Sequence, residues 1–289
     1  MRKKNYWMPA GICKTHSHCR KTRKVRGAML KDTLQHDVIS VSGIDVEVRT
    51  YGTGAPLLLL AGEEQLEVDS PFVHDLARDY KVILPSPPGF GTSGRPVWMT
   101  SPDDIAYVML DLVEKLEIEK LPVVGCSLGG WIAVEMATKD DSRLSRMALI
   151  DPYGVKIGGP FDVDIQDLWI QHPAKVTAMK WRDVEKSKRD FSSMSDDQLS
   201  VIARNTETFA RFCWEPYMHN PKLRHRLHRI ATPTLVIWGE NDGVAAPSYG
   251  KAYAGLIPGA KFETIAEAGH YPQIEQPEAT MKALRAFLA

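Results

Sequence analysis

A serine flanked by glycines stands where a predicted strand meets a predicted helix. The run Gly125-Cys126-Ser127-Leu128-Gly129-Gly130 follows the apolar stretch 121–124 and precedes the helix-like stretch 131–139. A turn this sharp strains the backbone of the serine, and it needs small residues two positions before and two after it. The turn also exposes the hydroxyl at the strand end and points the first amides of the helix toward its target. The run therefore predicts a nucleophilic Ser127 on an α/β sheet.

Predicted strands and helices alternate along most of the chain. Short apolar runs indicate strands, and the amphipathic stretches between them indicate helices. Strict alternation favours an α/β fold with a mostly parallel eight-stranded sheet flanked by helices. The expected strands are 39–41, 44–50, 57–60, 81–85, 121–126, 146–151, 233–239 and 261–266, and the expected helices are 71–78, 102–116, 128–139, 247–256 and 277–288.

The alternation stops between the strand that ends at residue 151 and the strand that begins at residue 233. The intervening segment is rich in aromatic residues and methionine and has helical tendency. It predicts a helical cap at 153–229, inserted into an α/β core formed by 31–152 and 230–289. Aromatic residues of this kind favour an apolar pocket, but they would equally form the core of the cap itself. The candidate pocket residues are Trp131, Trp169, Trp181 and Trp214.

The first 30 residues differ in charge from the rest of the chain. They hold nine basic side chains and no acidic one, although the whole chain has a formal net charge of zero. We expect 1–30 to be a disordered basic extension or an over-extended start, with a transit peptide as a weaker alternative. Four potential zinc ligands lie there, but their spacing is too compressed for paired zinc knuckles, so we expect no metal site. They are Cys13, His16, His18 and Cys19.

Composition sets limits on location and partners. Hydrophobic residues make up 44% and charged residues 25% of the chain, which is ordinary for a soluble globular protein. The longest apolar run, 56–61, is too short to cross a bilayer, and four cysteines imply no disulfide framework. We therefore expect a cytoplasmic protein that binds a small-molecule substrate, but neither nucleic acid nor membrane. A homodimer is a further candidate.

Two residues downstream of Ser127 are suited to activate it. A serine hydroxyl needs a base to take its proton and an acid to orient that base. His270 follows the last predicted strand, at the edge where open parallel sheets place their sites. Asp242 follows the preceding strand at the same edge, and the chain order Ser–Asp–His is the one that accompanies this turn. We expect Ser127, His270 and Asp242 to form a catalytic triad.

Other residues near these positions have less certain roles. Glu240 and Asp151 are alternative acids, because Glu240 follows the predicted strand 233–239 and Asp151 ends the predicted strand 146–151. An oxyanion would be held by two backbone N–H groups, those of Leu128 and Glu63. Cys126 is expected to be a small packing residue rather than a nucleophile.

Together these motifs resemble the α/β-hydrolase fold superfamily, in particular its capped, cofactor-free esterases and C–C hydrolases. The resemblance covers residues 39–289 and rests on the run 125–130, on Pro87-Pro88-Gly89-Phe90-Gly91-Thr92-Ser93, on Gly239-Glu240-Asn241-Asp242 and on Gly269-His270. Ala61-Gly62 stands where His-Gly is usual in this family. The backbone donor needs no histidine side chain, so we expect a difference only in the packing of the oxyanion loop. A serine nucleophile argues against the related haloalkane dehalogenases and epoxide hydrolases.

The expected function is hydrolysis of an ester or similar acyl bond in a small to medium, largely apolar substrate, through an acyl-enzyme and without a cofactor. One alternative is a C–C bond hydrolase or lyase that uses the same triad. Another is a ligand-binding receptor or pseudo-enzyme of the same fold.

Overall fold

The computed structural model describes residues 34–64 and 70–289, so the expectations for 1–30 lie outside the described residues. Within the compact unit Asp32–Ala289, eight strands form one sheet in the order β1-β2-β4-β3-β5-β6-β7-β8. β2 is antiparallel to both β1 and β4, and the remaining neighbours are parallel, which confirms the predicted sheet. The strands are Gln35–Val41 (β1), Ile44–Tyr51 (β2), Ala55–Leu60 (β3), Tyr80–Pro85 (β4), Leu121–Cys126 (β5), Leu144–Ile150 (β6), Thr234–Gly239 (β7) and Lys261–Ile265 (β8).

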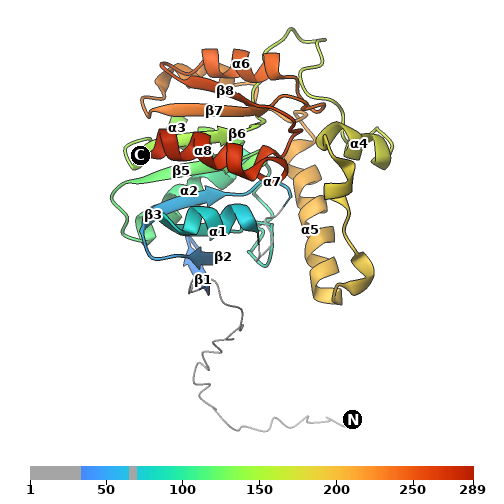
Figure 1. Cartoon of the computed structure of the whole chain (residues 1–289). Coiled ribbons are helices and arrows are strands. Elements are labelled where there is room, and N and C mark those ends of the chain that lie inside the picture. Colours follow the sequence, from blue (N-terminus) through green and yellow to red (C-terminus); the bar gives the residue numbers. More distant parts are fainter. Residues whose placement is uncertain (1–33, 65–69) are drawn as a thin grey trace, which may run out of the picture. The chain divides into compact units, whose positions relative to one another are not determined.

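Helices cover both faces of this sheet (Figure 1). The α-helices are Pro71–Ala77 (α1), Pro102–Lys115 (α2), Leu128–Lys139 (α3), Pro173–Lys180 (α4), Asp196–Cys213 (α5), Pro247–Gly255 (α6), Pro272–Glu275 (α7) and Pro277–Leu288 (α8). Buried side chains of α1 and α8 form one core cluster with the sheet, and those of α2, α3 and α6 form another. In β3, Leu58 and Leu60 belong to one cluster while Leu57 and Leu59 belong to the other, which explains why this strand is wholly apolar.

The segment between β6 and β7 contains α4, α5 and four short 3-10 helices: Val184–Ser187 (η1), Phe191–Ser193 (η2), Leu223–His225 (η3) and Leu227–Arg229 (η4). Helix α5 begins at a capping box formed by Ser195 and Gln198. Its buried side chains hold the glycine-rich loop that follows β4: Thr208 Oγ1 donates to Gly89 O at 2.9 Å, and Asn205 Oδ1 accepts from Gly91 N at 2.9 Å. This segment therefore packs firmly on the core.

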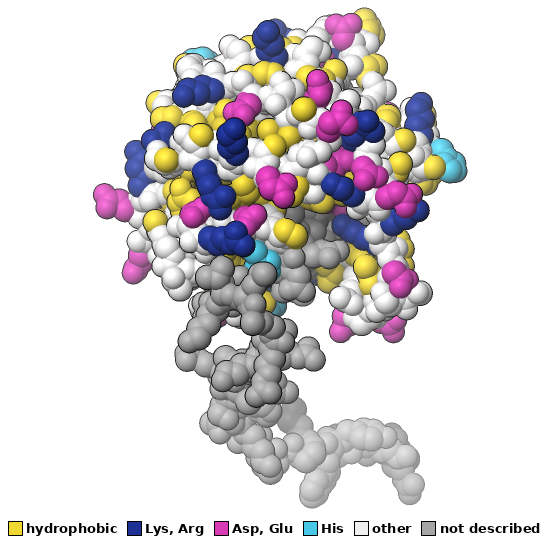
Figure 2. Space-filling model, viewed as in Figure 1, with side chains coloured by type: hydrophobic (Ala, Val, Ile, Leu, Met, Phe, Trp, Pro, Cys, Tyr) yellow, Lys and Arg dark blue, Asp and Glu magenta, His cyan; other side chains and the backbone are white. Residues whose placement is uncertain are grey.

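On the face shown in Figure 2, basic and acidic side chains are intermingled over the surface. Among the residues that the structure describes, none of the helices combines the length and the apolar character that crossing a membrane requires.

Candidate active site

Ser127 stands alone between β5 and α3, with φ 51° and ψ −116°. Two glycines allow this turn. A Cβ on Gly125 would lie 2.7 Å from Gly129 O, and a Cβ on Gly129 would lie 2.1 Å from Leu60 O. A side chain at Gly125 would push away the first turn of α3, and one at Gly129 would push that turn away from β3, so the strained serine depends on both glycines.

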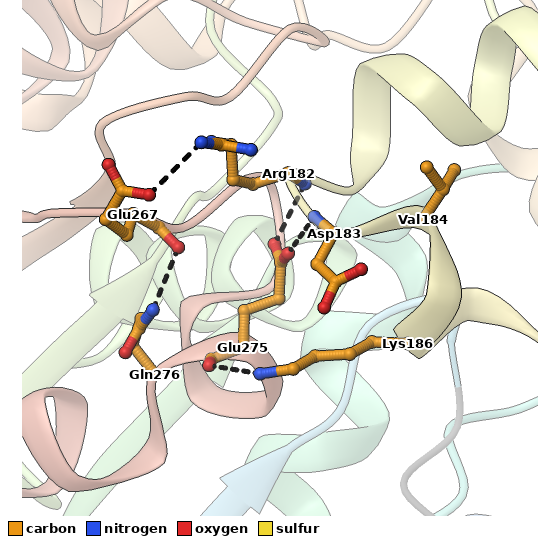
Figure 3. A pocket seen from close by; sticks show the side chains of 7 residues that line it. All are labelled: Arg182, Asp183, Val184, Lys186, Glu267, Glu275 and Gln276. Carbon is orange, nitrogen blue, oxygen red and sulfur yellow. Dashed lines mark hydrogen bonds and ion pairs between the residues drawn. The ribbon is translucent and has the colours of Figure 1, made fainter.

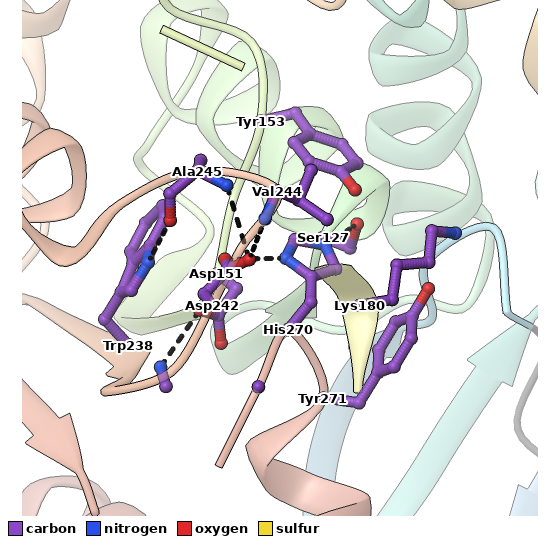
Figure 4. A network of polar contacts seen from close by, with 12 residues as sticks. Ser127, Asp151, Tyr153, Lys180, Trp238, Asp242, Val244, Ala245, His270 and Tyr271 are labelled. Atoms are coloured by element: carbon purple, nitrogen blue, oxygen red, sulfur yellow. Dashed lines mark hydrogen bonds and ion pairs between the residues drawn. The ribbon is translucent and has the colours of Figure 1, made fainter. Parts of the chain in front are cut away.

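The structure brings Ser127, His270 and Asp242 together (Figure 4). Ser127 Oγ lies 2.9 Å from His270 Nε2, and His270 Nδ1 lies 2.8 Å from Asp242 Oδ2. The exposed fractions of Ser127, His270 and Asp242 are 1%, 1% and 5%. This arrangement lets the imidazole take the hydroxyl proton while the carboxylate fixes its tautomer and stabilises its charged form.

Asp242 and His270 are both held in place by backbone groups. Oδ1 of Asp242 accepts hydrogen bonds from Val244 N at 2.8 Å and Ala245 N at 3.3 Å, which leaves Oδ2 directed at His270. His270 N donates to Lys180 O at 2.8 Å, so the end of α4 holds the histidine loop. The ring of Tyr153 stacks on the imidazole, with centroids 4.9 Å apart and planes inclined by 14°.

Glu275 also fixes the histidine loop to the segment after α4. Its carboxylate accepts from Gly269 N at 2.7 Å, from Arg182 N at 3.3 Å and from Asp183 N at 2.8 Å. A pocket opens beside this contact, lined by residues of that segment and of the loops around α7 (Figure 3). Neither Ser127 nor His270 nor Asp242 lines this pocket.

The side chain of Glu63 reaches the nucleophile. Its Oε2 accepts a hydrogen bond from Ser127 Oγ at 2.7 Å. Its Oε1 accepts from Lys180 Nζ at 2.9 Å, Tyr271 OH at 3.1 Å and Tyr153 OH at 3.4 Å. Four donors from separate parts of the chain thus converge on one carboxylate beside Ser127.

The charge of Glu63 is well stabilised. Burial raises the pKa of this carboxyl, but the charges of Lys180 and His270 and the hydrogen bond from Ser127 outweigh it and lower the pKa to about 2. Glu63 is therefore an anion at neutral pH. Because it competes with His270 for the single hydrogen of the Ser127 hydroxyl, its position affects how readily the serine is activated.

The two alternative acids lie in different surroundings. Glu240 is exposed and is the first residue after β7. Asp151 is fully buried directly after β6, and its Oδ1 accepts from Gly239 N at 3.0 Å. One oxygen of Asp151, one of Asp242 and a ring nitrogen of His270 lie within 4.8 Å of one another. These atoms have the spacing of metal ligands, but His270 and Asp242 are already bonded to each other.

The expected oxyanion donors lie close to the nucleophile. Leu128 is the first residue of α3, where backbone N–H groups have no partner within the helix. The loop before Glu63 presses against the serine, since a Cβ on Gly62 would lie 2.9 Å from Ser127 Cβ. The role of these two N–H groups remains a prediction.

The four candidate pocket tryptophans are dispersed. Trp131 is buried in α3 and donates to Glu135 Oε1, whereas Trp214 is 59% exposed. The Trp181 ring lies 4.9 Å from that of Tyr271, which places it at the edge of the site. Trp169 is separated from the imidazole by two rings, those of Phe209 and Tyr153, which form a continuous aromatic stack.

Sequence reasoning missed the side chains of Lys180, Tyr153 and Tyr271 at this centre, and it assigned only the backbone of Glu63. Tyr153 lies just after the end of β6, and Tyr271 directly follows His270. The nearness of each tyrosine to a strand end could have identified it. Lys180 ends α4, in the segment between β6 and β7, and no sequence signal pointed to it.

Comparison with known proteins places these observations in a family. The model of the alpha/beta hydrolase family matches residues 57–283. A 2-hydroxy-6-oxononadienedioate/2-hydroxy-6-oxononatrienedioate hydrolase from Paraburkholderia phymatum is 29% identical, over 72% of this chain and 76% of that protein. A 2-hydroxymuconate semialdehyde hydrolase from Pseudomonas sp. strain CF600 is 26% identical, over 87% of this chain and 93% of its own length.

The solved structures agree on the fold. A meta-cleavage product hydrolase superposes with a TM-score of 0.71 at 22% identity, covering 87% of this chain and 97% of its own.

Proposed function

Because the chain belongs to the alpha/beta hydrolase family, we propose that this hydrolase cleaves a carbon–carbon bond in a small 2-hydroxy-6-oxo acid. The curated relatives described above are named for hydrolysis of acids of this type. In this proposal Ser127 is the nucleophile, His270 is the base and then the acid, and Asp242 orients the imidazole.

The observation that carries the proposal is the set of donors around Glu63. Lys180 Nζ and the hydroxyls of Tyr153 and Tyr271 all point at a carboxylate that touches Ser127. A substrate with a carboxylate group matches this cationic, hydroxyl-rich surface once Glu63 moves aside. An uncharged substrate would make no use of the Lys180 ammonium.

The chemistry follows from the positions of the triad atoms. Ser127 Oγ bonds to the 6-oxo carbon while its proton passes to His270 Nε2, and the N–H groups of Leu128 and Glu63 stabilise the resulting alkoxide. Cleavage takes place in the keto tautomer of the substrate, in which the proton of the 2-hydroxyl has moved to the carbon beside the 6-oxo group. The bond between these two carbons then breaks, its electron pair is delocalised through the conjugated acid onto the 2-oxygen, and that oxygen takes the proton from His270. Water activated by His270 next hydrolyses the acyl-enzyme and restores the Ser127 hydroxyl.

Ester hydrolysis is the second candidate, because it needs the same triad and the same acyl-enzyme. The aromatic stack of Tyr153, Phe209 and Trp169 favours it, since these rings would suit an apolar acyl group. A cytoplasmic location and a homodimer remain predictions in either case.

One experiment separates the two candidates. Purified protein is incubated with 2-hydroxymuconate semialdehyde, and the loss of the dienoate absorbance is compared with hydrolysis of p-nitrophenyl esters of increasing chain length. The proposal predicts faster turnover of the semialdehyde, and none with Ser127→Ala. Turnover of esters with the dienoate left intact would reject C–C cleavage and favour the esterase.

A further inference from the structure

Asp151 lies directly after β6 and beside the triad, yet the mechanism above does not use it. Its side chain is fully buried, and its backbone has φ 44°. Asp151 N donates to Ile237 O at 3.0 Å, and Oδ1 accepts from Gly239 N at 3.0 Å. These two bonds fix the carboxyl group against the end of β7, close to Asp242 (Figure 4).

The second oxygen of Asp151 lacks a donor. Oδ2 is buried and has no hydrogen-bond partner in the described part of the chain. Its neighbour Asp242 already uses both oxygens as acceptors, from Val244, Ala245 and His270. An ionised Asp151 would therefore place a second buried anion against the first and leave Oδ2 unsatisfied. A proton on Oδ2 removes both costs, because the group can then donate to Asp242.

The groups that face Asp151 support its neutral form. They are Asp242, His270, Glu275 and Cys126, and only His270 can carry a positive charge. Burial and the charge of Asp242 raise the pKa of Asp151 well above its ordinary value and outweigh the hydrogen bond from Gly239 N, which lowers it.

We propose that Asp151 is a second acid of the triad: it keeps a proton on Oδ2, donates it in a hydrogen bond to Asp242, and can ionise in place of Asp242. The cluster then presents one negative charge to His270 instead of two. A second charge would raise the proton affinity of the imidazole and keep it protonated at neutral pH, where it must act as a base. Asp151 is thus a positioning residue that acts through Asp242.

This inference rests on the proposed triad but not on the substrate, so its test uses a fluorophosphonate probe that labels Ser127. A protein that cleaves no oxo acid could still be studied with this probe, because the probe reacts with Ser127 whatever the natural substrate is. The first readout is the acid-side midpoint, which is the pH at which the labelling rate falls to half of its maximum as His270 becomes protonated. Asp151→Asn keeps an acceptor for Gly239 and a donor for Asp242, and asparagine tolerates a positive φ.

If Asp151 is neutral, that midpoint in Asp151→Asn stays within about half a pH unit of wild type. If Asp151 is ionised, the substitution removes a negative charge near His270, and the midpoint falls by about one unit or more. The second result would overturn the proposal.

The second readout is a double-mutant cycle that a purely structural role would not affect. In Asp242→Asn, Asp151 loses its charged neighbour, ionises and supports the imidazolium. Asp151→Asn should therefore lower the labelling rate at least about tenfold more in the Asp242→Asn background than in wild type. Equal losses in both backgrounds, or an unreactive Asp242→Asn, would contradict the proposal.

Glu135→Gln provides the matched control, because Glu135 is equally buried but lies in α3 and contacts Trp131, Lys139 and Asn220 rather than the triad. It should leave the midpoint unchanged. Wild-type protein also gives a test that needs no folded Asp151 variant. Its infrared spectrum at neutral pH should contain the carbonyl band of a protonated carboxyl group, retained in Glu135→Gln. Absence of that band would overturn the proposal.

Discussion

Glu63 Oε2 accepts a hydrogen bond from Ser127 Oγ at 2.7 Å, so a carboxylate of the chain itself touches the nucleophile. A carboxylate is also what an acyl-enzyme releases at the same oxygen when water hydrolyses it. The resting site therefore resembles a site that still holds its product.

Removing the Glu63 carboxylate should let an external carboxylate bind in its place. In Glu63→Ala the Lys180 ammonium and the two tyrosine hydroxyls lose their internal acceptor. We expect acetate to protect Ser127 from fluorophosphonate labelling at concentrations at least about tenfold lower than in wild type. Glu64→Ala is the control, because Glu64 pairs with Arg189 at a half-buried position. Equal protection of all three proteins would show that Glu63 does not occupy a carboxylate site.

The Lys180–Glu63 pair should matter for stability because it is largely buried, with side-chain exposed fractions of 11% and 6%. Lys180→Met leaves the Glu63 carboxylate without its cation, and we expect it to lower the free energy of unfolding by about 3 kcal/mol. Adding Glu63→Gln should recover part of this loss. Urea denaturation measures both changes in the free energy of unfolding. The exposed pair Lys188–Glu185 is the reference, and Lys188→Met should lower the free energy of unfolding by less than about 1 kcal/mol.

Acid should weaken the fold through the same carboxyl group. Its pKa is about 2 in the folded protein and near the ordinary value of 4.5 when the chain is unfolded. Its contribution, about 3 kcal/mol, is therefore complete above pH 4.5 and is lost as the pH falls toward 2. Glu63→Gln lacks this contribution, so the stability difference between wild type and variant should shrink over that range. A difference that stays constant from pH 6 to pH 2 would refute the assignment.

Asp242 and Cys126 should differ sharply in their effect on labelling. Asp242→Asn removes the charge that stabilises the imidazolium, and the labelling rate should fall by about a hundredfold but stay measurable, because Asp151 then ionises and supplies part of that charge. Cys126→Ser should change it little, because burial raises the pKa of the Cys126 thiol and keeps it from acting as a thiolate. Mass spectrometry of the labelled peptide should place the adduct on Ser127, and an adduct on Cys126 would reverse this conclusion.

Glu275→Gln should slow catalysis without touching the triad. The carboxylate accepts from three backbone N–H groups, and an amide turns one oxygen into a donor that faces them. We expect about a tenfold lower labelling rate and a lower melting temperature. Glu267→Gln is the control, since Glu267 is exposed and pairs with the same Arg182 through its side chain. Similar labelling rates and melting temperatures of the two variants would show that the Glu275 carboxylate does not position His270.

Most of the fold was predictable because strands that are buried on both faces have an unmistakable apolar pattern. The carboxyl ends of parallel strands meet at one edge of the sheet and bring distant segments together. The residues that follow β5, β7 and β8 could therefore be placed near one another from the sequence. The helix Pro272–Glu275 was missed because four residues carry no periodic pattern.

The rest of the site depends on tertiary packing. Lys180 reaches Glu63 from the segment between β6 and β7, 117 positions away along the chain, and no local pattern encodes that approach. For Glu63 the sequence indicated the right residue but only its backbone amide. Which way its side chain turns is set by Lys180 and the two tyrosines.

Lys180 contributes two groups to the centre: its ammonium neutralises Glu63, and its carbonyl oxygen receives the backbone N–H of His270. A shift of the end of α4 would therefore move the counter-ion of Glu63 and the support of the base together. A rotation of the Lys180 side chain alone would free the Glu63 carboxylate and leave His270 in place, so the site can open to a molecule without losing the position of its base.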